Sequence, residues 1–481
     1  MGRPPRRPRF PPRSLRSLIL AAVFALAGYS PVLAHGELKG SSPEAGAHLR
    51  VAPRELRLTF TETPELAVAR LELLGPDGAR IALSPLRLSP DSNTVMISTI
   101  MGGLTAGTYT VSWQVAGADG HPVRGTFAFV IAPGAQGLGD PIAPMGVVPS
   151  RDSAATHHDP VSMPTSAQGF DAESPAYVGI RFLMYAALLT LIGAVAFRIV
   201  VLRLVQRLSD DIALVRGMAR RAAAVGFGAA VLLLGSALAR LAAQSIALHG
   251  NRGIGDLTLV GTLISGTSWG RTWLIQVIAT VVALVAFRVA RLDRASAAAW
   301  SLAATSSLAL AFTPAFASHA AASPRLTGLA IVSDGLHVIG AAGWLGSLLL
   351  VLAAGIPAAL SQTEDRRGAS VAHLINAFSP TALVFAGIVS LTGLFAAWLH
   401  VGGFAPLWQE RYGQLLLAKL AVLSVVTLTG AYNWLRVKPT LGQAEGAVRI
   451  RRSARIEVAV GVLILIVTAI LVATPTPMDT M

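Results

Sequence analysis

An aspartate and a histidine stand three residues apart in an apolar stretch of membrane-spanning length. Asp334 and His337 belong to the segment S-D-G-L-H-V-I-G-A-A-G-W-L-G at 333–346. This spacing places both side chains on one face of a helix, and ionisable groups inside membrane segments are costly, so they indicate functional sites. A carboxylate beside an imidazole can ligate a metal ion. The alternative is a polar pair that only locks helix packing, and the spacing alone does not separate the two.

Small residues follow this pair along the chain. Gly340, Ala341, Ala342 and Gly343 occupy consecutive positions directly after it. Residues without bulky side chains let helices approach closely within a membrane. We therefore expect other helices to pack against this segment and to surround the polar pair.

A second group of candidate ligands begins near the N-terminus. Residues 1–34 have the pattern of a secretory signal peptide, in which arginines precede a short apolar run and V-L-A stands at 32–34. An uncleaved anchor is the alternative. Cleavage after Ala34 would make His35 the first residue. Its α-amine and imidazole would then chelate one metal ion through two nitrogens, which suits Cu(II).

Residues 35–132 have the pattern of a small all-β domain. Short alternating runs are separated by turn signals such as G-P-D-G, which is typical of a β-sandwich or barrel. We expect Trp113 to belong to its core. The strands are predicted at 56–60, 67–73, 94–97, 109–115 and 126–131.

Two further candidate ligands lie in the segment A-D-G-H-P of this β domain. Asp119 and His121 are two residues apart, so on an extended chain both side chains point to one face. Together with His35 they offer an amine, two imidazoles and a carboxylate. This donor set predicts a closed Cu(II) site.

The composition is that of a membrane protein. Of the 481 residues, 53% are hydrophobic and 13% are charged. The net charge of +14 comes largely from the arginine-rich N-terminus and from loops between apolar runs, so it does not indicate nucleic acid as a partner. The chain has no cysteine, which excludes thiolate metal sites, disulfides and redox thiols.

A Pro-, Gly- and Ser-rich linker at 133–175 precedes a region, 176–475, with eight apolar runs of membrane-spanning length. Arg and Lys concentrate in the loops after the odd-numbered runs, which the positive-inside rule assigns to the cytoplasm. The β domain and the tail at 476–481 would then lie outside. The spans are predicted at 177–199, 219–243, 263–289, 296–317, 327–354, 378–400, 414–436 and 456–474.

Further candidate ligands lie in the outer half of these spans. His319 and His400 end the fourth and sixth spans, and His337 lies about 15 Å below the outer surface at about 1.5 Å per residue. Met184, in the first span, adds a thioether. A set of His and Met without Cys suits copper better than zinc. Histidines at the ends of spans also occur as interfacial residues, and that alternative stays open.

The β domain resembles the periplasmic copper-binding CopC family. The resemblance implies an Ig-like or cupredoxin-like Greek key sandwich in which His35, Asp119 and His121 ligate Cu(II). It places Glu62 beside them as an acidic neighbour. The methionine-rich Cu(I) loop of some members has no counterpart in this sequence. The matching segments are H-G-E-L-K-G-S-S-P at 35–43, L-T-F-T-E at 58–62 and V-S-W-Q-V-A-G-A-D-G-H-P-V-R-G-T-F at 111–127.

The apolar region resembles the CopD family of inner-membrane copper proteins. The matching segments are S-H-A at 318–320, D-G-L-H-V-I-G-A-A-G-W-L-G at 334–346, F-S-P at 378–380, Y-G-Q-L-L-L-A-K at 412–419 and R-R-S-A-R-I-E-V at 451–458. The two resemblances together imply that Cu(II) is captured outside and that copper, as Cu(I) or Cu(II), passes to His319, Asp334 and His337. They also imply uptake through a bacterial inner membrane, a role in copper resistance, and periplasmic copper carriers and membrane lipid as partners.

Two other functions remain open from the residues. An amine-plus-imidazole copper site also occurs in copper monooxygenases, although Asp119 would tend to close it. Two histidines at matched depth on facing helices can ligate haem in a b-type cytochrome. The chain has no G-x-x-x-x-G-K-[ST] motif, so we expect a binding and transport protein rather than an ATP-driven pump or another enzyme.

Overall fold

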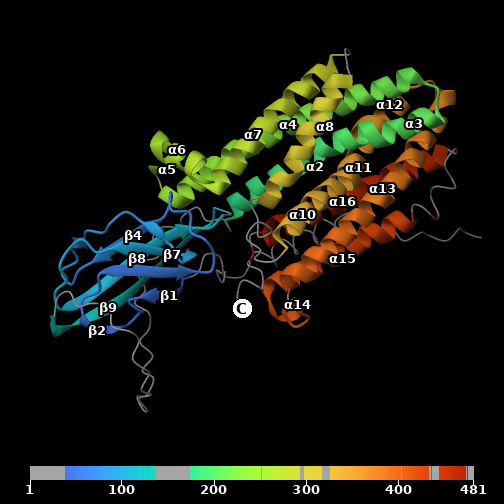
Figure 1. Ribbon diagram of the computed structural model, residues 1–481. Coiled ribbons are helices and arrows are strands. Elements are labelled where there is room, and N and C mark those ends of the chain that lie inside the picture. The colour runs from blue at the N-terminus through green and yellow to red at the C-terminus, as the bar shows by residue number, and fades with distance from the viewer. Residues whose placement is uncertain are drawn as a thin grey trace, which may run out of the picture. The chain divides into compact units, whose positions relative to one another are not determined.

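The fold was analysed in a computed structural model of the full chain (Figure 1). It has a β domain followed by a helical region. The structure describes residues 38–118, 120–136, 174–250, 252–292, 297–316, 326–401, 403–432, 435, 444–472 and 474.

The β domain is a sandwich of two sheets. All strand pairs are antiparallel except β2 with β9, which pair in parallel. One sheet has the order β1 (Leu38–Ser42), β3 (Glu55–Phe60), β7 (Ser92–Thr99), β6 (Arg87–Ser89). The other has the order β2 (His48–Val51), β9 (Pro122–Gln136), β8 (Gly107–Ala116), β4 (Arg70–Leu74), β5 (Arg80–Ile81).

Alternation along the strands builds the core between the sheets. Leu56, Leu58 and Phe60 of β3 are buried at every second position, and they pack with buried residues of β8 and β9 in one cluster. The ring of Phe60 meets that of Trp113 edge to face, with centroids 5.3 Å apart. Trp113 is 7% exposed, so its predicted place in the core is confirmed.

The predicted strands all lie on observed ones, and the differences occur where turns replace regular pairing. The run predicted from residue 67 begins as a strand only at Arg70, because backbone hydrogen bonds from Val68 to Glu65 and from Ala69 to Leu66 form turns. The short strands β1, β2, β5 and β6 were not predicted. All four have five or fewer residues, which is too short for a clear alternation.

The helical region contains eight long helical segments within the part of the chain that is described. Six of these are long and apolar enough to cross a membrane; α8 and α16 are the other two. The segments are α2 (Pro175–Ala196) continuing through η1 (Phe197–Val201) and α3 (Leu202–Leu208); α4 (Ile212–His249); α7 (Ser268–Arg291); α8 (Ala297–Phe316); α10 (Thr327–Ala341) continuing through η2 (Ala342–Gly346), α11 (Ser347–Leu350), η3 (Val351–Gly355) and α12 (Ile356–Leu360); α13 (Glu364–Val401); α15 (Arg411–Tyr432); and α16 (Ala444–Leu471). Short helices α5 (Arg252–Gly255), α6 (Leu257–Gly266) and α14 (Pro406–Gln409) complete the set.

Side-chain caps define several helix starts. Ser174 accepts a hydrogen bond from the backbone of Tyr177 at the start of α2, and Asp211 does the same for Leu214 of α4.

The third span, predicted as one run over 263–289, is instead divided. Thr267 has an extended backbone that ends α6, and its hydroxyl accepts from Gly270 to cap α7.

Small residues bring the helices of the bundle into close contact, as predicted. A methyl group at Gly343 would lie 2.5 Å from the ring of Phe385 on α13. One at Gly346 would lie 2.2 Å from the carbonyl oxygen of Leu189 and 3.0 Å from Cα of Gly193, both on α2. The segment that follows the Asp–His pair therefore packs directly against two other helices.

Candidate metal centre

Two of the residues predicted for the copper site of the β domain, Glu62 and His121, lie at one end of the sandwich. Glu62 lies in the loop after β3, and His121 lies in the connection between β8 and β9. The backbone of Glu65 donates a hydrogen bond to the carbonyl of Ala116, at 2.9 Å. This bond joins the two loops, so Glu62 and His121 belong to neighbouring segments at this end.

The connection between β8 and β9 is a turn rather than an extended strand. The backbone N–H of Gly120 donates to the carbonyl of Gly117 at 2.9 Å, and Gly120 has a φ of +82°. The alternation argument that placed Asp119 and His121 on one face therefore does not apply here. Asp119 and His35 lie outside the described residues, and His121 is half-buried directly before β9.

This end of the sandwich contacts the helices α4 and α7. The side-chain amide of Gln244, on α4, donates a hydrogen bond to the carbonyl of Gly120. The backbone of Ser268, at the start of α7, donates to the Glu65 carboxylate at 2.9 Å. A methyl group at Gly120 would lie 2.8 Å from the ring of Trp269. The connection that carries His121 thus contacts the helical region at Gly120, where a larger residue would clash with Trp269.

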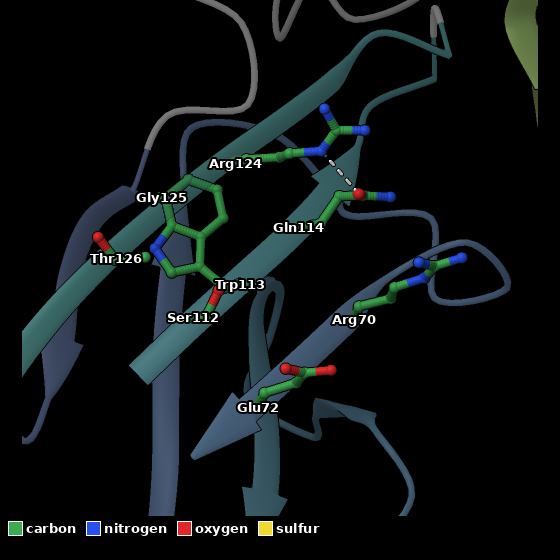
Figure 2. A pocket seen from close by; sticks show the side chains of 8 residues that line it. All are labelled: Arg70, Glu72, Ser112, Trp113, Gln114, Arg124, Gly125 and Thr126. Atoms are coloured by element: carbon green, nitrogen blue, oxygen red, sulfur yellow. Dashed lines mark hydrogen bonds between the residues drawn. The ribbon is translucent and has the colours of Figure 1, made fainter. Parts of the chain in front are cut away.

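A pocket on the β8–β9 sheet has a different chemistry (Figure 2). Arg124 donates to the side-chain oxygen of Gln114 at 2.8 Å, and the Trp113 ring lies against Gly125, where a methyl group would come within 2.5 Å of it. Guanidinium groups do not ligate cations. We therefore do not assign the metal centre to this pocket, which is lined by Arg70, Glu72, Ser112, Trp113, Gln114, Arg124, Gly125 and Thr126.

The Asp334–His337 pair of α10 meets polar residues from other helices. His337 Nδ1 lies 2.9 Å from the hydroxyl oxygen of Thr392 on α13. Lys419, on α15, lies within electrostatic range of both Asp334 and His337, and Tyr185 of α2 lies within range of Asp334. Polar groups of four helices thus lie in one region of the apolar bundle, and Thr392 is in hydrogen-bond contact with His337.

Only one of the other predicted ligands of the membrane region, Met184, has a described side chain. Met184 is 5% exposed and packs in the apolar core of the bundle. His400 lies in the last turn of α13, and its side chain is not described. His319 falls outside the described residues. Among the residues whose placement is known, no three His, Cys, Asp or Glu side chains converge as a metal cluster.

Sequence reasoning missed Thr392, Gln244 and Ser268. A threonine within an apolar helix is an ordinary residue, and its partner His337 stands 55 positions earlier, so no local pattern marks it. The two residues that contact the β domain are likewise separated from it by more than one hundred positions. Lys419 does carry a signal, since it is a charge inside an apolar run.

Comparison with known proteins defines the class. A model of the CopC domain matches residues 38–132. A model of the N-terminal domain of copper resistance protein D-like proteins matches 171–329, and a model of copper resistance protein D matches 372–471. The chain therefore has a CopC domain followed by a CopD-like region, and its six apolar helices fit the multi-pass membrane character of that region.

Two sequence relatives cover most of the chain and about a quarter of it, respectively. The copper transport protein CutJ of Bacillus subtilis (strain 168) is 25% identical over 450 residues, which cover 92% of this chain and 75% of that protein. Protein YobA of Escherichia coli (strain K12) is 31% identical over 119 residues, which cover 25% of this chain and 95% of that protein. The crystal structure of CopC from Methylosinus trichosporium OB3b has 26% identity and a TM-score of 0.20, covering 21% of this chain and 95% of that one.

Proposed function

We propose that this protein captures Cu(II) at the end of its β domain and passes copper through its helical bundle into the cell. The observation that carries the proposal is the Asp334–His337 pair, which lies within the bundle near polar groups of three other helices. A cation that crosses the bundle needs such groups to replace its water shell. The matches to CopC and to copper resistance protein D support copper as the cation.

The proposed Cu(II) ligands are His35, Asp119 and His121, with Glu62 as the acidic neighbour. The hydrogen bond between Glu65 and Ala116 supports the position of Glu62 beside the connection that carries His121. Imidazole and amine nitrogens with one carboxylate satisfy Cu(II) in a tetragonal arrangement. The contacts of Gly120 and Glu65 with α4 and α7 support transfer from this end of the sandwich to the helices.

The proposed route in the bundle passes Asp334 and His337. His319 and His400 would receive copper at the outer ends of α8 and α13, and Met184 would act only as a soft neighbour. The Lys419 ammonium interacts with Asp334 electrostatically. A copper ion that binds this carboxylate would therefore take over the role of its positively charged neighbour. The ion moved is Cu(I) or Cu(II).

The proposed location is the inner membrane of a bacterium, with the β domain and the C-terminal tail in the periplasm. The charge asymmetry of the loops and the signal-like N-terminus support this orientation independently of each other. Periplasmic copper carriers are the proposed donors, and the protein acts as a carrier rather than an enzyme.

Total cell copper, measured by mass spectrometry at limiting external copper, tests the proposal. Cells that lack the protein should contain less copper than cells that have it, and the protein with His337→Ala should not restore the difference. Equal or higher copper in cells that lack the protein would contradict import and would favour sequestration, efflux or a redox role.

A further inference from the structure

The hydroxyl group of Thr392 reaches the imidazole of His337 across the interface of α13 and α10. Its oxygen lies 2.9 Å from Nδ1 of the ring. The same oxygen lies 2.7 Å from the carbonyl oxygen of Ile388 and 3.2 Å from that of Val389, both one turn earlier on α13. Thr392 therefore stands between a backbone carbonyl and the ring nitrogen.

The number of hydrogens at this site determines the direction of each bond. A hydroxyl group has one hydrogen to donate, and a carbonyl oxygen can only accept. The short contact with Ile388 uses the hydroxyl hydrogen of Thr392. The bond to His337 must then run the other way, with Nδ1 as the donor. In the neutral ring this leaves Nε2 without a hydrogen and with a free lone pair.

We propose that Thr392 is a positioning residue that holds His337 in the Nδ1–H tautomer and presents Nε2 as the copper ligand. The ligand role rests on the proposed function, whereas the tautomer rests on the hydrogen bonds alone. Histidines that bind metals commonly donate their other N–H to a fixed acceptor, which sets the ring orientation and raises the basicity of the ligating nitrogen. Here a threonine on a neighbouring helix is that acceptor.

The packing around the ring agrees with this orientation. A methyl group at Gly393 would lie 3.5 Å from Cε1 and 3.9 Å from Nδ1 of His337. The Nδ1–Cε1 edge therefore faces the backbone of α13 at Thr392 and Gly393. A ligating role for Nε2 leaves these contacts intact, whereas a role for Nδ1 would require the ring to leave Thr392.

Nuclear magnetic resonance of the metal-free protein tests the tautomer. The full chain, with ¹³C- and ¹⁵N-labelled histidine, would be studied in lipid bilayers, and the His337→Ala variant would identify the signals of this ring by difference. We expect the Nδ1–H tautomer in the wild type and in Thr392→Ser, which keeps the hydroxyl. Thr392→Val keeps the shape without the hydroxyl and should populate the other tautomer. An Nε2–H ring in the wild type, or no change in Thr392→Val, would overturn the proposal.

Cu(I) affinity tests the ligand role. The measurement would use the full chain with His121→Ala, so that the β domain competes less, and a chromophoric Cu(I) chelator. We expect binding that depends on His337, a loss of about 10- to 100-fold in Thr392→Val, and near wild-type affinity in Thr392→Ser. An unchanged affinity in Thr392→Val would overturn the positioning role. A tautomer that follows Thr392 in a protein without His337-dependent copper binding would overturn the ligand role and contradict the proposed route, while the hydrogen-bond assignment would stand.

Discussion

The two candidate copper sites are built in opposite ways. In the β domain, Glu62 and His121 lie in loops at one end of a sandwich, and the strands hold those loops through bonds such as Glu65 to Ala116. In the bundle, Asp334 and His337 lie within one long helix, and the polar groups near them come from three other helices. In the loops a polar residue is ordinary and its spacing is the signal. In the bundle the polar residue is itself the signal, and its partners depend on packing.

The largest effect is expected at the N-terminus, and it concerns the β-domain site alone. One extra residue placed before His35 separates the α-amine from the imidazole and removes the two-nitrogen chelate. Cu(II) affinity, measured by competition titration of the full chain after signal removal, should fall by orders of magnitude. The same insertion should leave the tautomer of His337 unchanged. Wild-type Cu(II) affinity after the insertion would exclude the amine as a ligand.

The charges of the bundle should show a large effect on stability. Lys419→Met removes a cation within range of Asp334. Removal of one partner costs about 3–5 kcal/mol in a fully buried charge pair, and we expect a smaller cost here because both side chains are half-buried. We expect a lower Tm in detergent for Lys419→Met and recovery of most of it in the double variant with Asp334→Asn. If the double variant were no more stable than the single one, the two charges would not be coupled.

A smaller effect is expected from the close contact of η2 with α2. Gly346→Val would place a side chain 2.2 Å from the Leu189 carbonyl oxygen, where backbone must move. Overpacking of this kind costs about 1–3 kcal/mol, and thermal unfolding of the purified protein would measure it. Gly387→Val is the matched control, because nothing lies within 4 Å of a methyl group there. Equal Tm values for the two variants would show that this contact does not hold the bundle together.

A cross-link between the β domain and α7 is expected to have the smallest effect on stability, and its formation tests the contact itself. The chain has no cysteine, so a disulfide between Glu65→Cys and Ser268→Cys would be the only one. We expect it to form on mild oxidation, detected by mass spectrometry of peptides. The control pairs Ser268→Cys with Asp77→Cys, which lies in the β4–β5 turn beyond the far end of β4. Equal cross-linking of both pairs would contradict the specific contact of Ser268 with Glu65.

Much of the fold follows from local patterns. Period-two alternation marked β3 and β8, and apolar length marked the long helices. The division of the third span at Thr267 was not predicted, because the residues on both sides of it are apolar and the cap depends on one hydroxyl. The extended chain assumed at Asp119 was wrong at Gly120, where a positive φ makes a turn.

The candidate sites were predictable to different degrees. Asp334 and His337 could be found because a membrane segment makes any ionisable residue conspicuous. Thr392 could not, because only the packing of α13 on α10 brings its hydroxyl to His337. The same holds for Gln244, whose contact with Gly120 joins segments 124 residues apart.

Copper entry into proteoliposomes tests the central claim most directly. Vesicles would contain the full chain, the His337→Ala variant or no protein, and enriched copper isotope trapped inside would be measured by mass spectrometry after short exposures. The account predicts protein-dependent entry that His337→Ala reduces to near the protein-free level, while Cu(II) binding by the β domain of the same variant stays normal. Equal entry rates for the wild type and His337→Ala would contradict the proposed route and reduce the Asp334–His337 pair to a packing feature.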